Sequence, residues 1–314
     1  MSRWLLTGGA GYIGAHVLRA LQVAGNDVVV YDNLSTGLAQ RVPSDVPMIC
    51  ASVLDLPELT RAMRDHQVDG VIHLAAKKSV SESVAHPLRY YRENVGGINT
   101  VLLAMAEVGV RHIVYSSSAA VYGEPPWSPI REDTPCAPIS PYGETKLIGE
   151  WQVRAAAEPL DLSWVALRYF NVAGAVSADL ADTSVANLVP LVFAAIDAGE
   201  RPLVFGTDYP TPDGSCIRDY IHVVDLADAH VAAAEYCLRE RAQDVFNVGR
   251  GDGASVWEVM AAVSAQVGHD VNAEAAPRRA GDAPELVASV ERINAQLGWQ
   301  ASRSLADIVR RSLE

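Results

Sequence analysis

Cysteine is scarce in this chain, since only four of its 314 residues are cysteine. These four, Cys50, Cys136, Cys216 and Cys237, are scattered and form no CxxC pair. Such a pattern argues against a metal centre and against a disulfide framework. It is typical of a reduced, cytoplasmic protein.

Basic residues are also in short supply, with 25 Lys and Arg against 38 Asp and Glu and a formal charge of −13. This balance argues against a nucleic-acid partner, which requires a basic face. No apolar run approaches the roughly 20 residues of a membrane span, so no membrane partner is predicted. Because the first predicted strand begins within a few residues of the N-terminus, we expect no signal peptide.

The first half of the chain alternates short apolar strands with amphipathic helices, which predicts a parallel sheet with both faces covered. We therefore expect a Rossmann-type, doubly wound α/β fold. Predicted strands are Trp4–Thr7, Val28–Asp32, Gly70–Ala75, His112–Ser116, Ser163–Phe170 and Val245–Val248. Predicted helices are Ile13–Ala24, Leu56–His66, Val95–Val108, Glu144–Glu158 and Leu226–Leu238.

The rhythm changes after about residue 172, where prolines, glycines and short segments dominate from 173 to 214. Ser255 and Glu258 form a capping box that predicts a helix to about residue 267. We expect a cofactor domain over 1–172 with a return at about 215–249. A second, smaller α/β substrate-binding domain is expected over 173–214 and 250–314.

A glycine-rich turn joins the first predicted strand to the first predicted helix. Gly8, Gly11 and Gly14 permit a tight turn, close approach of backbone N–H groups to a pyrophosphate and close helix–strand packing. Tyr12 and Ile13 open the helix, whose N-terminus favours phosphates. The strand before and the helix after give this motif the context that a dinucleotide site requires.

Asp32 ends the second predicted strand and selects the cofactor. Its carboxylate suits the ribose 2′-hydroxyl of NAD and would repel the 2′-phosphate of NADP. The next residues, Asn33 and Leu34, offer no cation in compensation. We therefore predict NAD.

Ser116, Ser117 and Ser118 end a strand at the sheet edge where open α/β sheets bind ligands. Tyr142 and Lys146, four residues apart, lie on one face of a predicted helix. We expect the ammonium to lower the tyrosine pKa, so that the phenolate takes a proton from a substrate hydroxyl. Ser118 would hydrogen-bond the same oxygen.

These motifs together resemble the extended short-chain dehydrogenase/reductase superfamily and, within it, the UDP-glucose (UDP-galactose) 4-epimerase family. The resemblance covers nearly the whole chain, and the segment Asp213–Val223 is its most specific part. The other landmarks are Thr7–Gly14, Asp32–Leu34, Val71–Ala76, Glu82–Val84, Tyr90–Asn94, Ser116–Gly123, Pro141–Lys146 and Arg168–Asn171.

The resemblance implies roles for individual residues. It implies that Ser118, Tyr142 and Lys146 are catalytic. Cofactor contacts are implied for Gly8, Gly11, Tyr12, Ile13, Gly14, Asp32, Asn33, Ser52, Val53, Leu74, Ala75, Ala76, Lys78, Asn94, Ser116, Tyr142, Lys146 and Tyr169. Contacts to a UDP-sugar substrate are implied for Ser118, Tyr142, Asn171, Asn187, Leu188, Phe205, Arg218, Arg279, Asp282 and Leu286.

Simpler interpretations remain for some of these residues. Phe205 is alternatively a core residue, and Arg218 is alternatively an ordinary ion-pair partner of Asp219 or Asp225. His73 and His222 fit structural roles better than catalytic ones.

Two positions depart from the family pattern. Ser52 stands where the family usually has an aspartate that reaches the adenine, which weakens that contact without removing the Val53 N–H. Leu286 stands near Pro284 where the family often has a tyrosine. We hypothesise that this smaller side chain admits an N-acetyl group on the sugar.

Ala119 and Ala120 occupy positions where dehydratase and decarboxylase relatives usually carry a carboxylate. Neither alanine side chain can act as an acid or a base. This favours simple epimerisation at C4 through a transient 4-keto sugar, with NAD regenerated in each turnover. Alternatives are a 4-epimerase of a UDP-uronic acid or UDP-pentose and a non-catalytic, NAD-sensing regulator. The resemblance also implies a homodimer through the two helices at Val95–Val108 and Glu144–Ala156.

Overall fold

The computed structural model describes residues 1–184, 187–279 and 282–310. The chain divides into two compact units. Unit 1 comprises Met1–Gly123, Pro138–Arg168 and Ala227–Phe246, and unit 2 comprises Glu124–Ala137, Tyr169–Leu226 and Asn247–Glu314. Each unit is described below by itself.

A seven-stranded sheet is the centre of unit 1, in the order β10-β6-β5-β4-β1-β2-β3. Its pairs from β3 to β6 are parallel. The strands are β1 (Arg3–Thr7), β2 (Asp27–Tyr31), β3 (Met48–Ile49), β4 (Gly70–His73), β5 (His112–Ser116), β6 (Ser163–Tyr169) and β10 (Gln243–Val248). The order reverses between β1 and β4, and such a switch point is where doubly wound sheets bind dinucleotides. The predicted Rossmann-type fold is confirmed.

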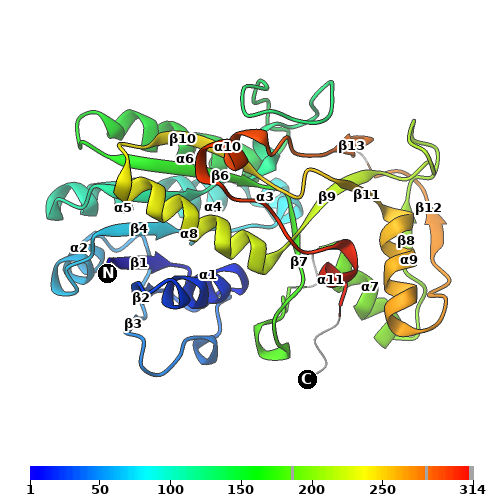
Figure 1. Cartoon of the computed structure of the whole chain (residues 1–314), viewed down its shortest axis with the longest axis horizontal. Coiled ribbons are helices and arrows are strands. Elements are labelled where there is room, and N and C mark those ends of the chain that lie inside the picture. Colours follow the sequence, from blue (N-terminus) through cyan, green and yellow to red (C-terminus); the bar gives the residue numbers. More distant parts are fainter. Residues whose placement is uncertain (185–186, 280–281, 311–314) are drawn as a thin grey trace. The chain divides into compact units, whose positions relative to one another are not determined.

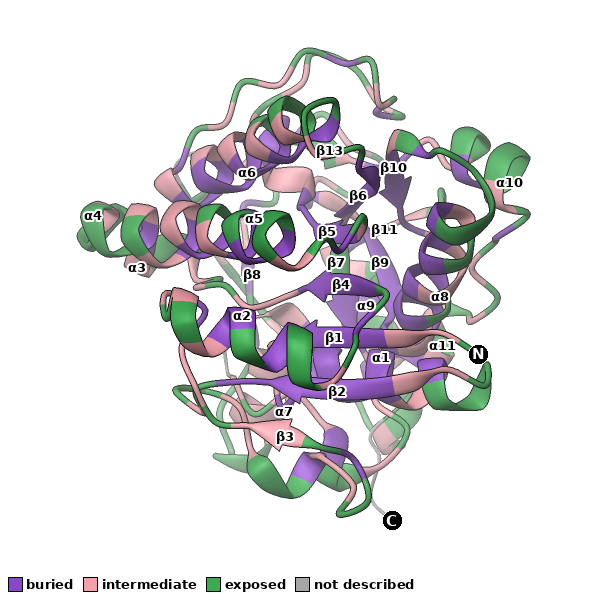
Figure 2. Ribbon diagram, turned by 90° about the vertical axis from the view of Figure 1, so that its left-hand side faces the viewer, coloured by how far each residue is buried: buried purple, intermediate pink, exposed green. Residues whose placement is uncertain are grey.

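Helices cover both faces of this sheet, with α2, α5 and α6 on one side and α1 and α8 on the other (Figure 2). The helices are α1 (Tyr12–Val23), α2 (Leu56–Asp65), α3 (Val80–Ala85), α4 (Pro87–Tyr90), α5 (Gly96–Val108), α6 (Pro141–Ala157) and α8 (Val223–Arg239). Short helical turns are η1 (Ala39–Arg41), a π-helical turn η2 (Tyr91–Val95) and η3 (Ala119–Val121).

The main core lies between the sheet and the helices α2, α5 and α6. Strand residues such as Val71 and Ile113 pack there against Met63 of α2, Met105 of α5 and Val153 of α6. Burying this apolar surface is the main free-energy gain that holds the sheet edge in place. The carboxyl ends of β1, β2, β4 and β5 therefore stand on a rigid base.

Most predicted elements lie within three residues of the observed ones, and the predicted helix start at Glu144 is three residues too late. Helix α6 begins at Pro141, with Ser140 as N-cap, and the Ser140 Oγ accepts the Gly143 N–H at 3.2 Å. Proline is well suited to the first helical position because its missing N–H has no partner there. Tyr142 therefore lies inside the first turn of the helix, on the same helix as Lys146 as its spacing predicted.

Unit 2 contains small sheets and helices of its own (Figure 1). Its strand β9 pairs with β7, β11 and β13, and β12 pairs with β8. The strands are β7 (Asn171–Ala173), β8 (Leu203–Phe205), β9 (Ile217–His222), β11 (Gly253–Ser255), β12 (Glu274–Ala276) and β13 (Glu285–Leu286). The helices are η4 (Ala178–Leu180), α7 (Leu188–Asp197), α9 (Val256–Val267), α10 (Glu291–Leu297) and α11 (Leu305–Ile308).

The predicted capping box at the start of α9 is confirmed, with Ser255 and Glu258 each bonding the other's backbone N–H. The apolar face of α9 packs with α7 and β9 residues into a separate core, which includes Val189, Tyr220, Val259 and Val263. No helix among the residues that the structure describes is both long and apolar enough to cross a membrane.

Candidate active site

The glycine-rich turn between β1 and α1 is packed so tightly that side chains do not fit. A Cβ on Gly14 would lie 2.1 Å from the Gly8 carbonyl oxygen, and one on Gly8 would lie 2.8 Å from the Ala75 nitrogen. Gly8 also has φ +75°, a conformation that favours glycine. Gly11 caps α1 with no side-chain hydrogen bond, so the helix N-terminus is open to an anion.

Asp32 follows β2 and is buried, with both carboxylate oxygens held by backbone. Oδ2 accepts the Ala10 N–H at 3.1 Å, and Oδ1 accepts the Leu34 N–H at 2.8 Å. Burial raises the pKa of this carboxyl, and the two N–H donors oppose that rise. A carboxylate oxygen accepts more than one hydrogen bond, so Asp32 keeps capacity for a ribose hydroxyl. The neighbouring Asn33 is exposed, and its side chain accepts the Ser35 N–H.

The other residues expected to contact the cofactor are placed around the same sheet edge. Leu74 and Ala75 follow β4, where their N–H groups donate to the Thr7 carbonyl and hydroxyl oxygens. Ser52 turns its hydroxyl to the Leu54 N–H at 3.2 Å, which starts the turn into α2. Val53 is buried, Tyr12 and Ile13 open α1, and Ala76 and Lys78 are exposed.

Asn94 is buried in the π-helical turn η2 and stabilises the loop after β4 by hydrogen bonds. Its Oδ1 accepts the Lys77 N–H at 2.7 Å, and its Nδ2 donates to the Lys77 carbonyl and to the Thr145 Oγ1. Asn94 therefore ties this loop to α6. The local sequence does not predict these hydrogen bonds, because the partners of Asn94 lie 17 and 51 residues away in the chain.

Tyr142, Ser118 and Lys146 come together at the carboxyl end of β5. All three are buried, and Ser118 hydrogen-bonds Tyr142. The Lys146 Nζ lies 6.0 Å from the centre of the Tyr142 ring and donates to the Ser116 carbonyl at 2.7 Å. The serine, tyrosine and lysine therefore have the arrangement needed for proton transfer at a substrate hydroxyl.

The expected fall in the Tyr142 pKa does not occur in the protein by itself. Burial raises the pKa of Tyr142, and the hydrogen bond from Ser118 opposes the rise. Desolvation penalises the charged form of any group, and for Tyr142 it is the larger of these two effects. Burial also lowers the pKa of Lys146 to about 8.

Two histidines near this edge have structural partners. His73 Nδ1 lies 2.8 Å from the Thr7 hydroxyl, the ring stacks on Tyr115, and burial lowers its pKa to about 3. His230 Nε2 lies 2.9 Å from the Ser116 hydroxyl. Ser116 therefore offers its hydroxyl to α8 and its carbonyl to Lys146.

In unit 2, Arg218 on β9 is paired with Asp282 and with neither of the acids that the simpler interpretation named. Its guanidinium donates to Asp282 at 3.3 Å and to the Ala283 and Ile217 carbonyls. Asp225 instead pairs with Arg303. The structure thus brings two residues expected at the diphosphate and ribose into contact.

Phe205 is half-buried at the end of β8, and the Arg279 guanidinium lies 3.7 Å from its ring centre. Leu286 on β13 is the register partner of Arg218. Tyr169 ends β6, Asn171 begins β7 and is exposed, and Asn187 caps α7, which begins at Leu188. Apart from Ser118 and Tyr142 of unit 1, the residues expected to contact substrate therefore fall on separate elements of unit 2, with Arg218, Asp282 and Leu286 gathered around β9.

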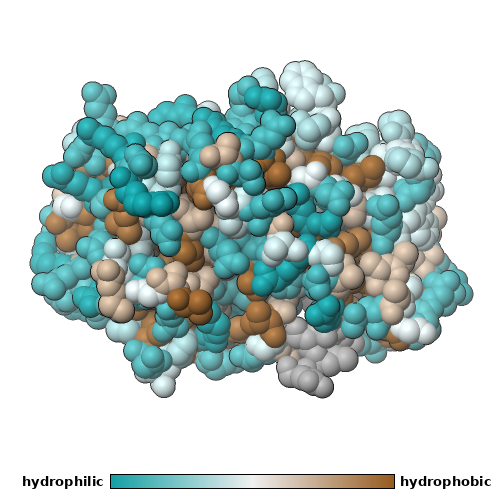
Figure 3. All heavy atoms as spheres, in the orientation of Figure 1, coloured by the Kyte–Doolittle hydropathy of each residue, from teal (hydrophilic) through white to brown (hydrophobic). Residues whose placement is uncertain are grey.

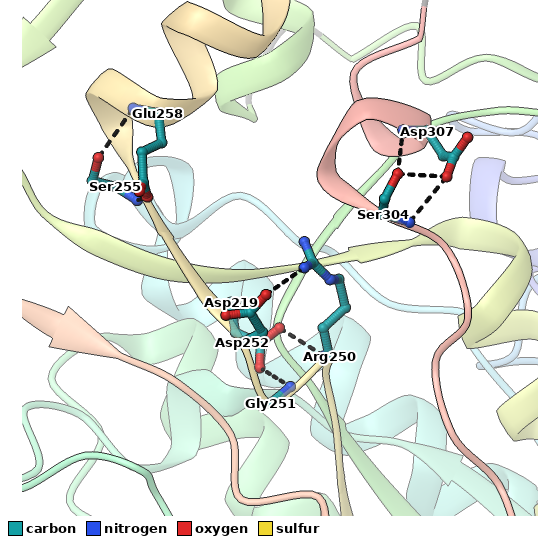
Figure 4. A network of polar contacts seen from close by, with 8 residues as sticks. All are labelled: Asp219, Arg250, Gly251, Asp252, Ser255, Glu258, Ser304 and Asp307. Carbon is teal, nitrogen blue, oxygen red and sulfur yellow. Dashed lines mark hydrogen bonds and ion pairs between the residues drawn. The ribbon is translucent and has the colours of Figure 1, made fainter.

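Two buried carboxylates had no role in the sequence analysis. Glu150 of α6 forms an ion pair with Arg168 of β6, and both side chains are nearly fully buried. Asp219 of β9 accepts the N–H groups of Arg250, Gly251 and Ala288, the first two of which are drawn in Figure 4. Burial raises the pKa of Asp219 to about 6 against these three donors. Glu150 lies outside the sequence motifs, and the motif Asp213–Val223 that contains Asp219 does not reveal its partners, because they are distant in the chain.

Within the described part of the chain, no group of three or more His, Cys, Asp or Glu side chains is arranged to hold a metal ion. The uncapped N-terminus of α1, the glycines that a Cβ would overfill and the backbone-held Asp32 instead fit a dinucleotide. The model of the "NAD dependent epimerase/dehydratase family" matches residues 4–249 of this chain, in agreement with this fit. The chain belongs to this family.

Several relatives within this family are described as UDP-sugar 4-epimerases. A UDP-glucose 4-epimerase of Azospirillum brasilense is 48% identical over 99% of this chain and 90% of its own length. A crystal structure of UDP-glucose 4-epimerase from Stenotrophomonas maltophila, with bound NAD and formylated UDP-arabinopyranose, is 38% identical with a TM-score of 0.94, over 98% of this chain and 96% of that one. The UDP-Glc/GlcNAc 4-epimerase of Campylobacter jejuni is 36% identical with a TM-score of 0.88, over 99% and 97%.

Proposed function

We propose that this chain catalyses the reversible 4-epimerisation of UDP-glucose and UDP-galactose with bound NAD. The observation that carries the proposal is the buried group of Tyr142, Ser118 and Lys146, which stands on the same sheet edge as the glycine-rich turn and Asp32. We assign the cofactor to unit 1 and the nucleotide part of the substrate to residues of unit 2. The four cysteines are free thiols, which supports a cytoplasmic location.

NAD, when bound, would supply a hydride acceptor for C4 of the sugar and, once reduced, a hydride donor for the opposite face of the 4-keto sugar. Tyr142 takes the 4-hydroxyl proton and later gives it back. Ser118 orients the same oxygen by a hydrogen bond, and Lys146 stabilises the phenolate by its charge. Lys146 itself donates to the Ser116 carbonyl at 2.7 Å, which positions its ammonium.

Ala119 and Ala120 support epimerisation over elimination of water. They form the short turn η3 directly after Ser118, and neither side chain transfers protons. An acid or base at this turn would be needed to expel a hydroxyl from the sugar. The turn of this chain therefore favours oxidation and reduction at one carbon.

The deciding experiment incubates purified chain with UDP-galactose and without added cofactor. We expect UDP-glucose to form with no net production of NADH, and the denatured protein to release NAD. Tyr142→Phe should lower the rate by about 10²–10⁴-fold, the usual contribution of a general acid–base group. Tyr91→Phe, which removes the hydrogen bond from Tyr91 to Glu144, is the matched control. Net NADH formation, or full activity of Tyr142→Phe, would overturn the proposal.

We further propose that Leu286 leaves room for an N-acetyl group at C2 of the sugar. The side chain is half-buried on β13, in register with Arg218. The Campylobacter relative described as a UDP-Glc/GlcNAc 4-epimerase lends support. Leu286→Tyr should abolish turnover of UDP-N-acetylglucosamine while sparing UDP-glucose. No turnover of the N-acetyl sugar by the unaltered chain would refute this proposal.

We also propose a homodimer built on α5 and α6. Helices α3, α4 and α5 all pack against α6, and large apolar side chains on them face outward: Val80, Val84, Leu88, Leu103 and Trp151. Apolar residues that gather on neighbouring helices mark an interaction site. On the face drawn in Figure 3, apolar and hydrophilic residues are interspersed.

The dimer is tested by the molar mass in solution. Trp151 is 55% exposed, and Trp151→Glu should yield a monomer that keeps its fold. Val23→Glu on α1, at a residue 89% exposed, is the control and should leave the mass unchanged. A monomeric unaltered chain, or a dimer that survives Trp151→Glu, would contradict this arrangement.

A further inference from the structure

The buried face of α6 carries three ionisable residues at intervals of four. Tyr142, Lys146 and Glu150 are each at least nine-tenths buried. Residues four apart on a helix are neighbours, so Glu150 follows Lys146 as Lys146 follows Tyr142. The proposed reaction uses the first two of these residues and leaves Glu150 without a role.

Both oxygens of the Glu150 carboxylate are held. Oε1 accepts the Ser117 hydroxyl at 2.5 Å and the Arg168 Nε at 2.9 Å, and Oε2 accepts the Arg168 Nη2 at 2.6 Å. This fork is the strong bidentate form of an arginine–carboxylate pair. The carboxylate therefore has a single position.

Arg168 is fixed in turn by Tyr122. Its Nη1 donates to the Tyr122 hydroxyl at 2.9 Å, and its guanidinium lies 4.9 Å from the centre of that ring. Tyr122 directly follows η3, the turn that begins after Ser118. The ion pair is therefore anchored on the same loop as the catalytic serine.

The end of β5 links Glu150 to Lys146. The carbonyl of Ser116 accepts from Lys146, and the hydroxyl of the next residue, Ser117, donates to Glu150. The groups that face Lys146 are the rings of Tyr142 and Tyr115, the imidazole of His73 and the carboxylate of Glu150. His73 is uncharged at neutral pH because burial lowers its pKa to about 3. Glu150 thus supplies negative charge near a desolvated ammonium, and the Arg168 guanidinium that holds it places a positive charge beside that carboxylate.

We propose that Glu150 is a positioning residue that keeps Lys146 charged, and thereby keeps Tyr142 able to ionise, in a site that excludes water. This inference rests on the proposed function. Burial lowers the pKa of Lys146, and Glu150 raises it. A Lys146 that lost its proton near neutral pH would no longer stabilise the phenolate. Arg168 and Ser117 hold the compensating charge in place.

The test is the pH dependence of kcat for Glu150→Gln, with Glu150→Asp as the charge-retaining control. We expect the acidic limb of the Glu150→Gln profile to move to higher pH by about one unit, which is about a tenfold loss at pH 7 that recovers at alkaline pH. Glu150→Asp should keep the limb of the unaltered chain. A loss that is equal at every pH, or an unmoved limb, would overturn the proposal.

A second readout needs no turnover. Tyrosinate absorbance is titrated in the NAD-loaded chain, and the same titration of Tyr142→Phe is subtracted to isolate Tyr142. The Tyr142 titration should move to higher pH in Glu150→Gln, and an unchanged titration would refute the inference. Because this readout is independent of substrate, it separates failure of the Glu150 role from failure of the proposed reaction.

Glu150→Gln leaves Arg168 buried with its charge unpaired, which weakens the fold. The double variant Glu150→Gln/Arg168→Gln replaces the ion pair by two neutral amides. Because it also removes the Arg168 charge, we expect the acidic limb and the tyrosinate titration to move in the same direction as in the single variant but by a smaller amount. Unshifted values in a folded double variant would equally overturn the role of Glu150.

Discussion

Gly143 lies so close to Ala120 that a Cβ on the glycine would be 2.5 Å from the Ala120 carbonyl oxygen. This contact sets the first turn of α6, which carries Tyr142, against the turn that follows Ser118. The backbone oxygen has no freedom to move aside in the way a flexible side chain does. The close approach of this helix turn to the turn after Ser118 therefore requires a residue without a Cβ at position 143.

Gly143→Ala should accordingly separate Tyr142 from Ser118. A displacement of about 1 Å at reacting groups costs about a hundredfold in rate, and we expect a loss of this size in kcat. Gly96→Ala is the control, because its Cβ would meet only the end of the Leu54 side chain at 3.3 Å. Equal activity of the two variants would show that the close approach is not needed for catalysis.

Asp32→Ala should weaken NAD binding, and it also leaves the Ala10 and Leu34 N–H groups without their acceptor. A hydrogen bond to a charged group contributes roughly 1.5–3 kcal/mol, so we expect Kd to rise about ten- to hundredfold. Titration calorimetry of NAD-free protein measures the change. Asp27→Ala, at the exposed start of β2 where Asp27 pairs with Arg3, should leave Kd unaltered. Unchanged NAD affinity in Asp32→Ala would remove Asp32 from the cofactor site.

Asp219→Asn should destabilise unit 2. An amide keeps one acceptor oxygen, but its NH₂ group faces the N–H groups that Oδ2 now accepts, those of Gly251 and Ala288. Leaving buried donors unpaired costs about 2–4 kcal/mol in the free energy of unfolding. Chemical denaturation measures this, with Asp252→Asn at an exposed partner of Arg250 as the control. A loss no larger than that of the control would show that the Asp219 nest is dispensable.

His73 predicts how stability depends on pH. Its pKa is about 3 in the folded protein, well below the usual value of about 6.5 in the unfolded chain. Between these values the unfolded state binds a proton that the folded state does not, so stability falls as pH falls. We expect a loss of about 2 kcal/mol between pH 6.5 and pH 5 from this residue.

Denaturant unfolding at several pH values checks this window. His73→Phe should be less stable than the unaltered chain at pH 7, because Thr7 loses its partner, but its stability should depend less on pH. His112→Phe, at a half-exposed edge of β5, is the control and should keep the pH dependence. The same pH slope in His73→Phe as in the unaltered chain would refute the role of His73.

The sequence by itself determined the Rossmann-type fold, because alternating apolar strands and amphipathic helices are local patterns. It also indicated the cofactor turn and the Tyr142–Lys146 face, which depend on spacings of a few residues along one element. The wrong start of α6 has a local cause as well, since Ser140 and Pro141 form a helix start that lies just before Tyr142.

Tertiary structure alone decided which distant groups meet. The partners of Glu150 lie directly after β5 and on β6, Arg218 pairs with Asp282, and Asp219 accepts backbone N–H groups from two segments. Such contacts join residues 18–69 positions apart, and no local pattern specifies which of many acids and bases will be neighbours. Burial then decided the charges, since desolvation raised the pKa of Tyr142 where the spacing of Tyr142 and Lys146 had predicted a fall.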